Sequence, residues 1–153
     1  MENDLAGAAN WEMTGRWYSP VHGRGMQIFK ARTVGVDRND FGVTVGLARD
    51  SSCEGSEDAF ILQRSSVDAI DAPGIAGIYI EVPIQRYVAY GGIIDATLCR
   101  DSFEVRLNDE TAIRFGGASG FRGEFSIDED AFDDLRDALR FVFRDCDCYN
   151  EVT

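Results

Sequence analysis

The segment "EDAFDDLRDALRFVF", residues 129 to 143, decides the fold class because its apolar residues recur every three or four positions. That spacing places one apolar stripe along a helix, and the stripe must pack against another surface. Acidic residues crowd the first turns and arginines follow, which suits the helix dipole. Asp128 can cap the helix, or Ser126 and Glu129 can form a capping box. The stripe consists of Phe132, Leu135, Leu139, Val142 and Phe143.

The residues before this helix have a different period. In "FGVTVGLAR", large apolar side chains alternate with small or polar ones, which is typical of a strand. The same alternation occurs in "GIYIEV" and "SFEVRL", and we also predict strands at "AFILQR" and "TAIRF". The sequence therefore predicts an α+β fold: a mostly antiparallel sheet of about seven to nine strands with one C-terminal helix packed on it.

The 153 residues suffice for one domain with its own core. We expect this domain to span residues 26–145. Residues 1–25, rich in glycine and containing Trp11 and Trp17, are expected to form an arm, and residues 146–153 a short acidic tail.

The composition favours a protein partner. Twenty-seven acidic residues against fifteen basic ones give a net charge of -12, which repels nucleic acid and anionic lipid and attracts a basic protein. No apolar run approaches the roughly 18 residues of a membrane span. The first residues, "MENDLAGAAN", lack the apolar core of a secretory signal. We therefore expect a cytoplasmic protein that binds neither nucleic acid nor membrane.

Signatures of metal, cofactor or nucleophilic chemistry are missing. The four cysteines are expected to be free thiols, and His22 lies far from the C-x-C of Cys146 and Cys148, so we predict no metal. No G-x-S-x-G elbow or phosphate-binding G-K-[ST] loop occurs, and we predict no cofactor. One catalytic option stays open, in which Glu81 and Asp95 share a sheet face and act as paired carboxylates.

Two adjacent glycines, Gly91 and Gly92, interrupt the stretch "YVAYGGIID" at residues 87–95. Glycine accepts positive φ, so the pair can form a two-residue hairpin turn. Alternatively, it can permit a bulge or a close backbone approach within a strand.

The order of several motifs resembles the immunity protein 10 family of bacterial polymorphic-toxin systems. The resemblance covers about residues 27 to 143. Its densest part is a strand ending in "YIEV", followed by an aromatic residue, "YGGI" and a leucine. The matching residues of this part are Tyr79, Ile80, Glu81, Val82, Tyr90, Gly91, Gly92, Ile93 and Leu98. Before it come Ala31, Val34, Gly35 and Val36, then "VTVGL" and "LQRS". After it come Phe132, Leu135, Arg136, Ala138 and Leu139 of the predicted helix.

This resemblance implies a protein that binds and neutralises a cognate toxin and thereby protects the producing cell, with no enzymatic activity of its own. The negative charge favours a basic, nuclease-like toxin domain, bound by a monomer or a homodimer. Two alternatives remain: a small carboxylate-dependent hydrolase, and an acidic adaptor or nucleic-acid mimic that binds another basic protein.

Four residues near the glycine pair are the candidates for toxin contact. Tyr79 and Glu81 point away from the apolar face of their strand, while Tyr90 and Asp95 flank the glycines. If the helix covers this face as well, Tyr79 becomes core and Glu81 a buried, paired acid. A second candidate surface is a rim of loop acids, Asp50, Glu54, Glu57 and Asp58.

Overall fold

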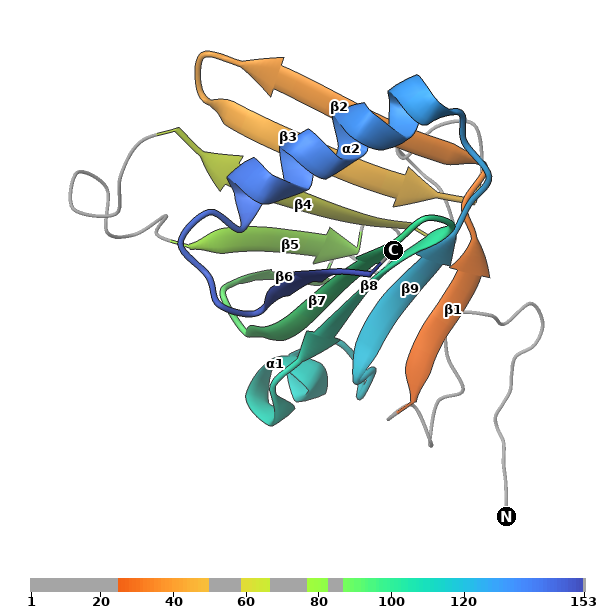
Figure 1. The fold of residues 1–153 in the computed structure, drawn as a ribbon. Helices are drawn as coiled ribbons and strands as arrows, with labels where there is room; N and C mark the ends of the chain where they lie inside the picture. The colour runs from red at the N-terminus through yellow and green to blue at the C-terminus, as the bar shows by residue number, and fades with distance from the viewer. Residues whose placement is uncertain (1–24, 50–58, 67–76, 83–86, 153) are drawn as a thin grey trace.

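The structure is a computed structural model that describes residues 25–49, 59–66, 77–82 and 87–152. Within these residues, ten strands form two five-stranded sheets, and the C-terminal helix α2 packs against one of them (Figure 1). The predicted α+β class, with mostly antiparallel strands and a C-terminal helix, is confirmed. The strands are divided between two sheets, which the sequence pattern did not reveal.

Sheet B is antiparallel throughout and has the strand order β2-β3-β4-β5-β6. Its register aligns one apolar row across all five strands: Val36, Val45, Leu62, Ile80 and Ala89. This row marks the inner face, and the alternate residues point to the outer face. The strands are β2 (Thr33–Asn39), β3 (Gly42–Ala48), β4 (Ala59–Ser65), β5 (Ile78–Val82) and β6 (Tyr87–Tyr90).

Sheet A has the order β1-β9-β8-β7-β10. Its three central strands are antiparallel, whereas the edge strands β1 and β10 pair in parallel with β9 and β7. The strands are β1 (Met26–Lys30), β7 (Ile93–Cys99), β8 (Ser102–Leu107), β9 (Gly120–Glu124) and β10 (Tyr149–Glu151).

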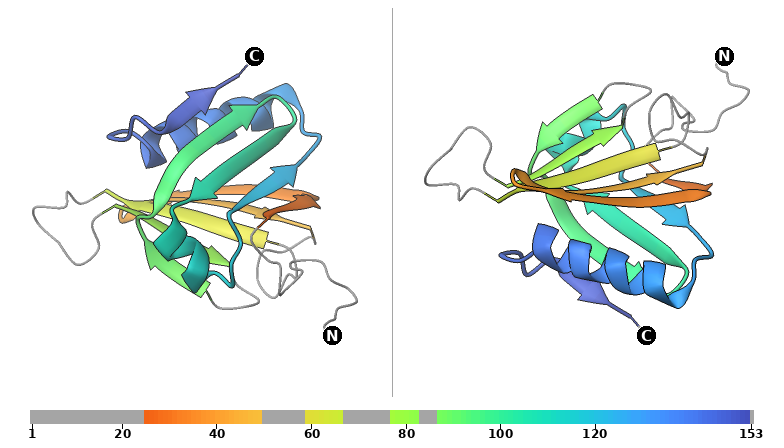
Figure 2. Two further views of the ribbon diagram at one scale, coloured as in Figure 1. Left: turned by 90° about the horizontal axis from the view of Figure 1, so that it is seen from below. Right: turned by 90° about the horizontal axis from the view of Figure 1, so that it is seen from above.

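Helix α2 (Glu129–Val142) runs across β2, β3 and β4 (Figures 1 and 2). Its N-cap is Asp128, whose Oδ1 accepts a hydrogen bond from the backbone N–H of Ala131 at 2.8 Å. Asp128, and not the alternative capping box, therefore starts the helix. Arg64, on the inner face of β4, donates to the carbonyl of Val142 at 2.9 Å, so the helix lies on the inner side of sheet B.

A single hydrophobic core joins both sheets and α2. Phe60 of β4 lies 6.1 Å from Phe103 of β8 and 6.0 Å from Phe121 of β9, measured between ring centroids. Leu135 and Leu139 of α2 are fully buried in the same core. Sheet A and α2 thus both pack against the inner face of sheet B. Neither covers Tyr79 and Glu81, which point to the outer face of sheet B.

The prediction of a strand at "TAIRF" is wrong, because this segment belongs to helix α1 (Asp109–Arg114). Asn108 caps the helix by accepting a hydrogen bond from the N–H of Thr111 at 2.8 Å, and two acids follow in the first turn. A favourable cap and dipole override the strand preference of a short stretch with two β-branched residues.

The end of the described chain also differs from expectation. Cys146 and Cys148 form a disulfide, whereas we predicted free thiols. The bridge closes the turn between α2 and β10, which then pairs with the edge of β7. Cys99 is a free cysteine.

Candidate functional site

The outer face of β5 and β6 brings together three of the four predicted contact residues. Tyr79 of β5 is directly opposite Tyr90 of β6, and their ring centroids lie 5.1 Å apart with an interplanar angle of 55°. Glu81 follows two residues after Tyr79 and therefore points to the same side of the sheet. Because α2 packs on the opposite face, Tyr79 is half-buried and not part of the core.

A hydrogen bond orders Tyr79 and Glu81. The phenol hydroxyl of Tyr79 donates to Oε1 of Glu81 at 2.9 Å. Burial raises the pKa of Tyr79 to about 12, and the hydrogen bond to Glu81 and its negative charge act in the same direction. Tyr79 is therefore a neutral, fixed donor at physiological pH, and it orients the carboxylate of Glu81.

Apolar residues border this carboxylate on both neighbouring strands. Glu81 is opposite Ile61 of β4 on one side and Val88 of β6 on the other. Val88 is 43% exposed and Tyr90 is 52% exposed. We call this set of residues the outer β5–β6 face: Ile61, Tyr79, Glu81, Val88 and Tyr90. Ile61 and Val88 were not among the predicted contact residues, because strand alternation indicates the face of each residue but not the register that places both beside Glu81.

Asp95 does not join this face. It lies on β7 of sheet A, where it is opposite Arg106. Its two carboxylate oxygens accept hydrogen bonds from Asn150 and Thr97, each at 3.2 Å. Glu81 and Asp95 consequently belong to different sheets, and the expectation that they share one sheet face as paired carboxylates is wrong.

The glycine pair explains this separation. Gly91 and Gly92 have φ angles of 81° and 91°, so the predicted positive φ is confirmed. They do not close a hairpin, because β6 lies in sheet B and β7 in sheet A. Gly91 donates to the carbonyl of Ile78 at 2.8 Å, and a Cβ at Gly92 would collide with the side chain of Thr111. At this glycine pair the chain passes from sheet B to sheet A, close to α1. The next residue, the half-buried Ile93, packs on the hydrophobic core.

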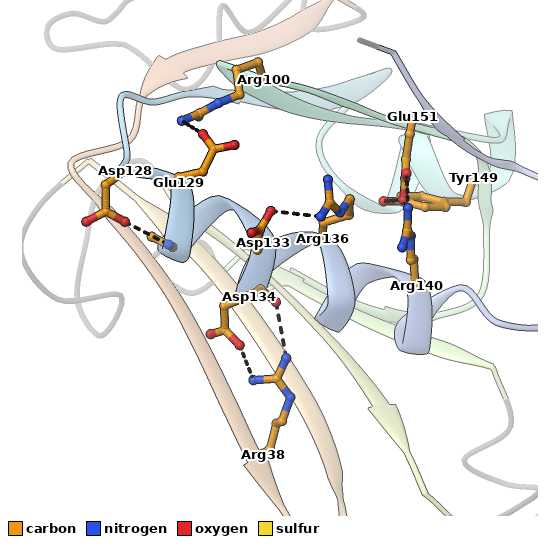
Figure 3. A network of polar contacts seen from close by, with 11 residues as sticks. Arg38, Arg100, Asp128, Glu129, Asp133, Asp134, Arg136, Arg140, Tyr149 and Glu151 are labelled. Atoms are coloured by element: carbon orange, nitrogen blue, oxygen red, sulfur yellow. Dashed lines mark hydrogen bonds and ion pairs between the residues drawn. The ribbon is translucent and has the colours of Figure 1, made fainter.

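Arginines pair with some of the acids elsewhere on the described surface. Around α2, Arg38 pairs with Asp134 at 2.7 Å and Arg140 with Glu151 at 2.7 Å (Figure 3). On the outer face of sheet A, Glu104 faces two arginines, Arg106 at 3.1 Å and Arg122 at 3.7 Å. Glu81, like several other described acids such as Asp95 and Asp101, forms no ion pair among the residues that the structure describes; what distinguishes it is the tyrosine pair beside it.

A shallow cavity of about 430 Å³ lies at the β1–β9 edge of sheet A. Its polar lining combines Lys30 and Arg122 with Asp101 and Glu124. These opposite charges give it no uniform preference for an anion or a cation. The cavity is also formed by sheet A, and none of the four predicted contact residues lines it.

Several predictions concern residues outside the described ranges. They include the loop acids Asp50, Glu54, Glu57 and Asp58, together with His22 and the two tryptophans of the N-terminal arm. Among the described residues, no group of three or more histidine, cysteine or acidic side chains is placed to hold a metal ion. None of the helices in those ranges has the length and apolar character needed to cross a membrane.

Comparison with protein families assigns most of the chain to a known family. The model of a family described as immunity protein 10 matches residues 30–133, which is more than half of the chain and includes the whole outer β5–β6 face. Neither a curated protein nor a solved structure matches the chain significantly. The chain therefore belongs to the immunity protein 10 family.

Proposed function

We propose that this protein neutralises a cognate toxin by binding it through the outer β5–β6 face. Membership of the immunity protein 10 family supports the general role of toxin neutralisation. The observation that carries the choice of surface is the pairing of the half-buried Tyr79 with the exposed Tyr90 beside Glu81, whose carboxylate Tyr79 orients. Aromatic side chains beside a charged group are typical anchors of protein interfaces.

Inhibition then requires no bond to be made or broken by this chain. The sheet supplies a rigid platform, since β5 is hydrogen-bonded to both β4 and β6. The net charge of -12 would attract a basic toxin domain, such as a nuclease, and speed the encounter. We place this encounter in the cytoplasm of the cell that carries both genes.

Co-expression with the toxin domain encoded by the neighbouring gene tests the proposal. The wild-type chain should restore growth, and Glu81→Arg should abolish the rescue, because it reverses the charge at the centre of the face. Asp130→Arg is the matched control: Asp130 is exposed on α2, which packs on the other face of sheet B. Circular dichroism and thermal unfolding must show that both variants remain folded.

Two results would contradict this function. If the wild-type chain gives no rescue and does not bind the toxin domain, neutralisation of that toxin is wrong. If Asp130→Arg abolishes rescue while Glu81→Arg leaves it intact, the binding surface lies on the α2 side and the assignment to the outer β5–β6 face is wrong.

A further inference from the structure

The sequence Tyr-x-Glu occurs in two strands of this protein, and the two copies adopt the same local arrangement. In β5, the hydroxyl of Tyr79 donates to Glu81 at 2.9 Å. In β10, the hydroxyl of Tyr149 donates to Glu151, also at 2.9 Å. In both strands the tyrosine and the glutamate are two residues apart and point to one face of the sheet.

Each copy also has a second aromatic ring beside the tyrosine. The ring of Tyr149 stacks on Phe143, with centroids 5.3 Å apart and planes inclined by 8°. The ring of Tyr79 lies 5.1 Å from that of Tyr90, with planes inclined by 55°. The hydroxyl, the carboxylate and the paired rings therefore recur, although the stacking angle differs.

The two copies differ in what binds the carboxylate. Arg140 of α2 donates to both oxygens of Glu151, from Nε and from Nη2, each at 2.7 Å (Figure 3). A two-point contact of this kind is the geometry that a planar guanidinium favours on a carboxylate. Glu81 has the orienting tyrosine but no arginine, because α2 lies on the other side of sheet B and no described residue supplies one.

We infer that the outer β5–β6 face receives an arginine side chain of the toxin, in the way that Glu151 receives Arg140 within the chain. This inference rests on the proposed neutralising function. The carboxylate of Glu81 would accept the guanidinium hydrogen bonds while the guanidinium plane lies against the ring of Tyr90. Tyr90 and Glu81 are diagonal neighbours on adjacent strands, a separation of about 7–8 Å that a long side chain can bridge.

The chain itself shows that arginines bind its aromatic rings. The guanidinium carbon of Arg144 lies 4.2 Å from the ring centroid of Phe141, and that of Arg100 lies 4.7 Å from Phe132. Such contacts are attractive because the ring face carries partial negative charge. The apolar neighbours Ile61 and Val88 would exclude water around the bound guanidinium and strengthen its contact with Glu81.

The test measures binding of the toxin domain by titration calorimetry, with single toxin arginines changed to lysine or glutamine. Glu81→Gln should weaken binding by about thirtyfold to a few thousandfold, the usual range for removing one charge from a buried pair. One toxin arginine should give a similar loss, and the two changes together should cost little more than either alone. Asp130→Asn, which also removes one negative charge, should leave the affinity within about threefold.

Tyr79→Phe and Tyr90→Ala test the roles of the two rings. Tyr79→Phe keeps the ring but removes the hydroxyl that orients Glu81, so it should weaken binding less than Glu81→Gln. Tyr90→Ala should weaken binding of the wild-type toxin more than binding of the toxin that lacks the coupled arginine.

Three outcomes separate this inference from the proposed function. Coupling of Glu81 to one toxin arginine, not reproduced by lysine, supports it. If Tyr90→Ala weakens binding but no toxin arginine couples to Glu81, or if a lysine does so instead, the arginine inference is wrong while neutralisation through this face stands. If toxin binding and rescue are absent even with the wild-type chain, the proposed function itself is wrong.

Discussion

Arg140 holds Glu151 through two hydrogen bonds of 2.7 Å, and this pair fastens the last strand of the described chain to its last helix. The bonds to Arg140 are the main reason that the pKa of Glu151 is lowered. A carboxyl group with a lowered folded-state pKa stabilises the fold above its unfolded-state value of about 4.3. This stabilisation is lost as the pH falls through the lower, folded-state value.

We therefore expect acid to loosen β10 before the rest of the protein unfolds. The N–H of Val152 donates to Leu98, and that of Ala96 to Cys148, so both report on β10. Hydrogen exchange, corrected for the intrinsic effect of pH, should show these two amides losing protection below about pH 4. Glu151→Gln should produce the same loss at neutral pH. Equal protection in the variant and the wild type would contradict the role of this ion pair.

Tyr79 should keep its proton at pH values where an exposed tyrosine has lost it. Burial is the largest cause of its raised pKa of about 12, followed by the hydrogen bond to Glu81. Because the folded-state pKa exceeds the unfolded value of about 10, the associated stability is present below pH 10 and is lost as the pH rises towards 12.

A carbon-13 NMR titration of the tyrosine ring carbons measures this pKa directly, with Tyr79→Phe to assign the signal. Glu81→Gln should lower the pKa of Tyr79 but leave it above 10, since burial remains. A titration midpoint near 10 in the wild-type chain would show that Tyr79 is neither buried nor hydrogen-bonded to Glu81 as described.

Strand alternation was sufficient to predict that Tyr79 and Glu81 share the outer face of β5. It was not sufficient to predict which residues of other strands lie beside them. In "GIYIEV" every second side chain is large and apolar, so Tyr79 and Glu81 had to point the other way. Asp95 was misplaced because a glycine pair with positive φ fits a hairpin as well as a change of sheet. Tertiary structure distinguishes the two: β6 and β7 pair in different sheets, and Gly92 lies close to Thr111, nineteen positions later.

The second Tyr-x-Glu arrangement could not be predicted for a similar reason. The sequence "YNE" at residues 149–151 does not indicate that Arg140 binds the carboxylate of Glu151. That contact requires the turn after α2 and the parallel pairing of β10 with β7, both of which depend on tertiary packing. The helix itself was predictable, because its apolar stripe and its cap are local features.

Gly92→Ala should destabilise the protein strongly. An alanine at a φ of 91° is strained by about 1–2 kcal/mol, and its Cβ would also displace Thr111 of α1. We expect a loss of at least about 2 kcal/mol in the free energy of unfolding, measured by urea denaturation. The matched control is Gly35→Ala on β2, where a Cβ meets no atom within 4 Å. Equal stability of the two variants would contradict the close packing of the glycine pair against α1.

The Cys146–Cys148 disulfide should contribute little to stability, although it closes the turn before β10. The stabilisation from a disulfide increases with the logarithm of the number of residues in the loop that it closes. Here the two cysteines are only two residues apart, so the loop is very short. Replacing both by serine should therefore cost no more than about 1–2 kcal/mol in urea denaturation. Two other contacts of β10 stay in place: Tyr149 stacks on Phe143, and Arg140 pairs with Glu151.

The wild-type chain in excess dithiol should behave like the serine variant. Glu151→Gln should reduce the hydrogen-exchange protection of β10 more than either. If the serine variant instead loses all protection of the Val152 amide while Glu151→Gln retains it, the disulfide and not the ion pair holds the strand.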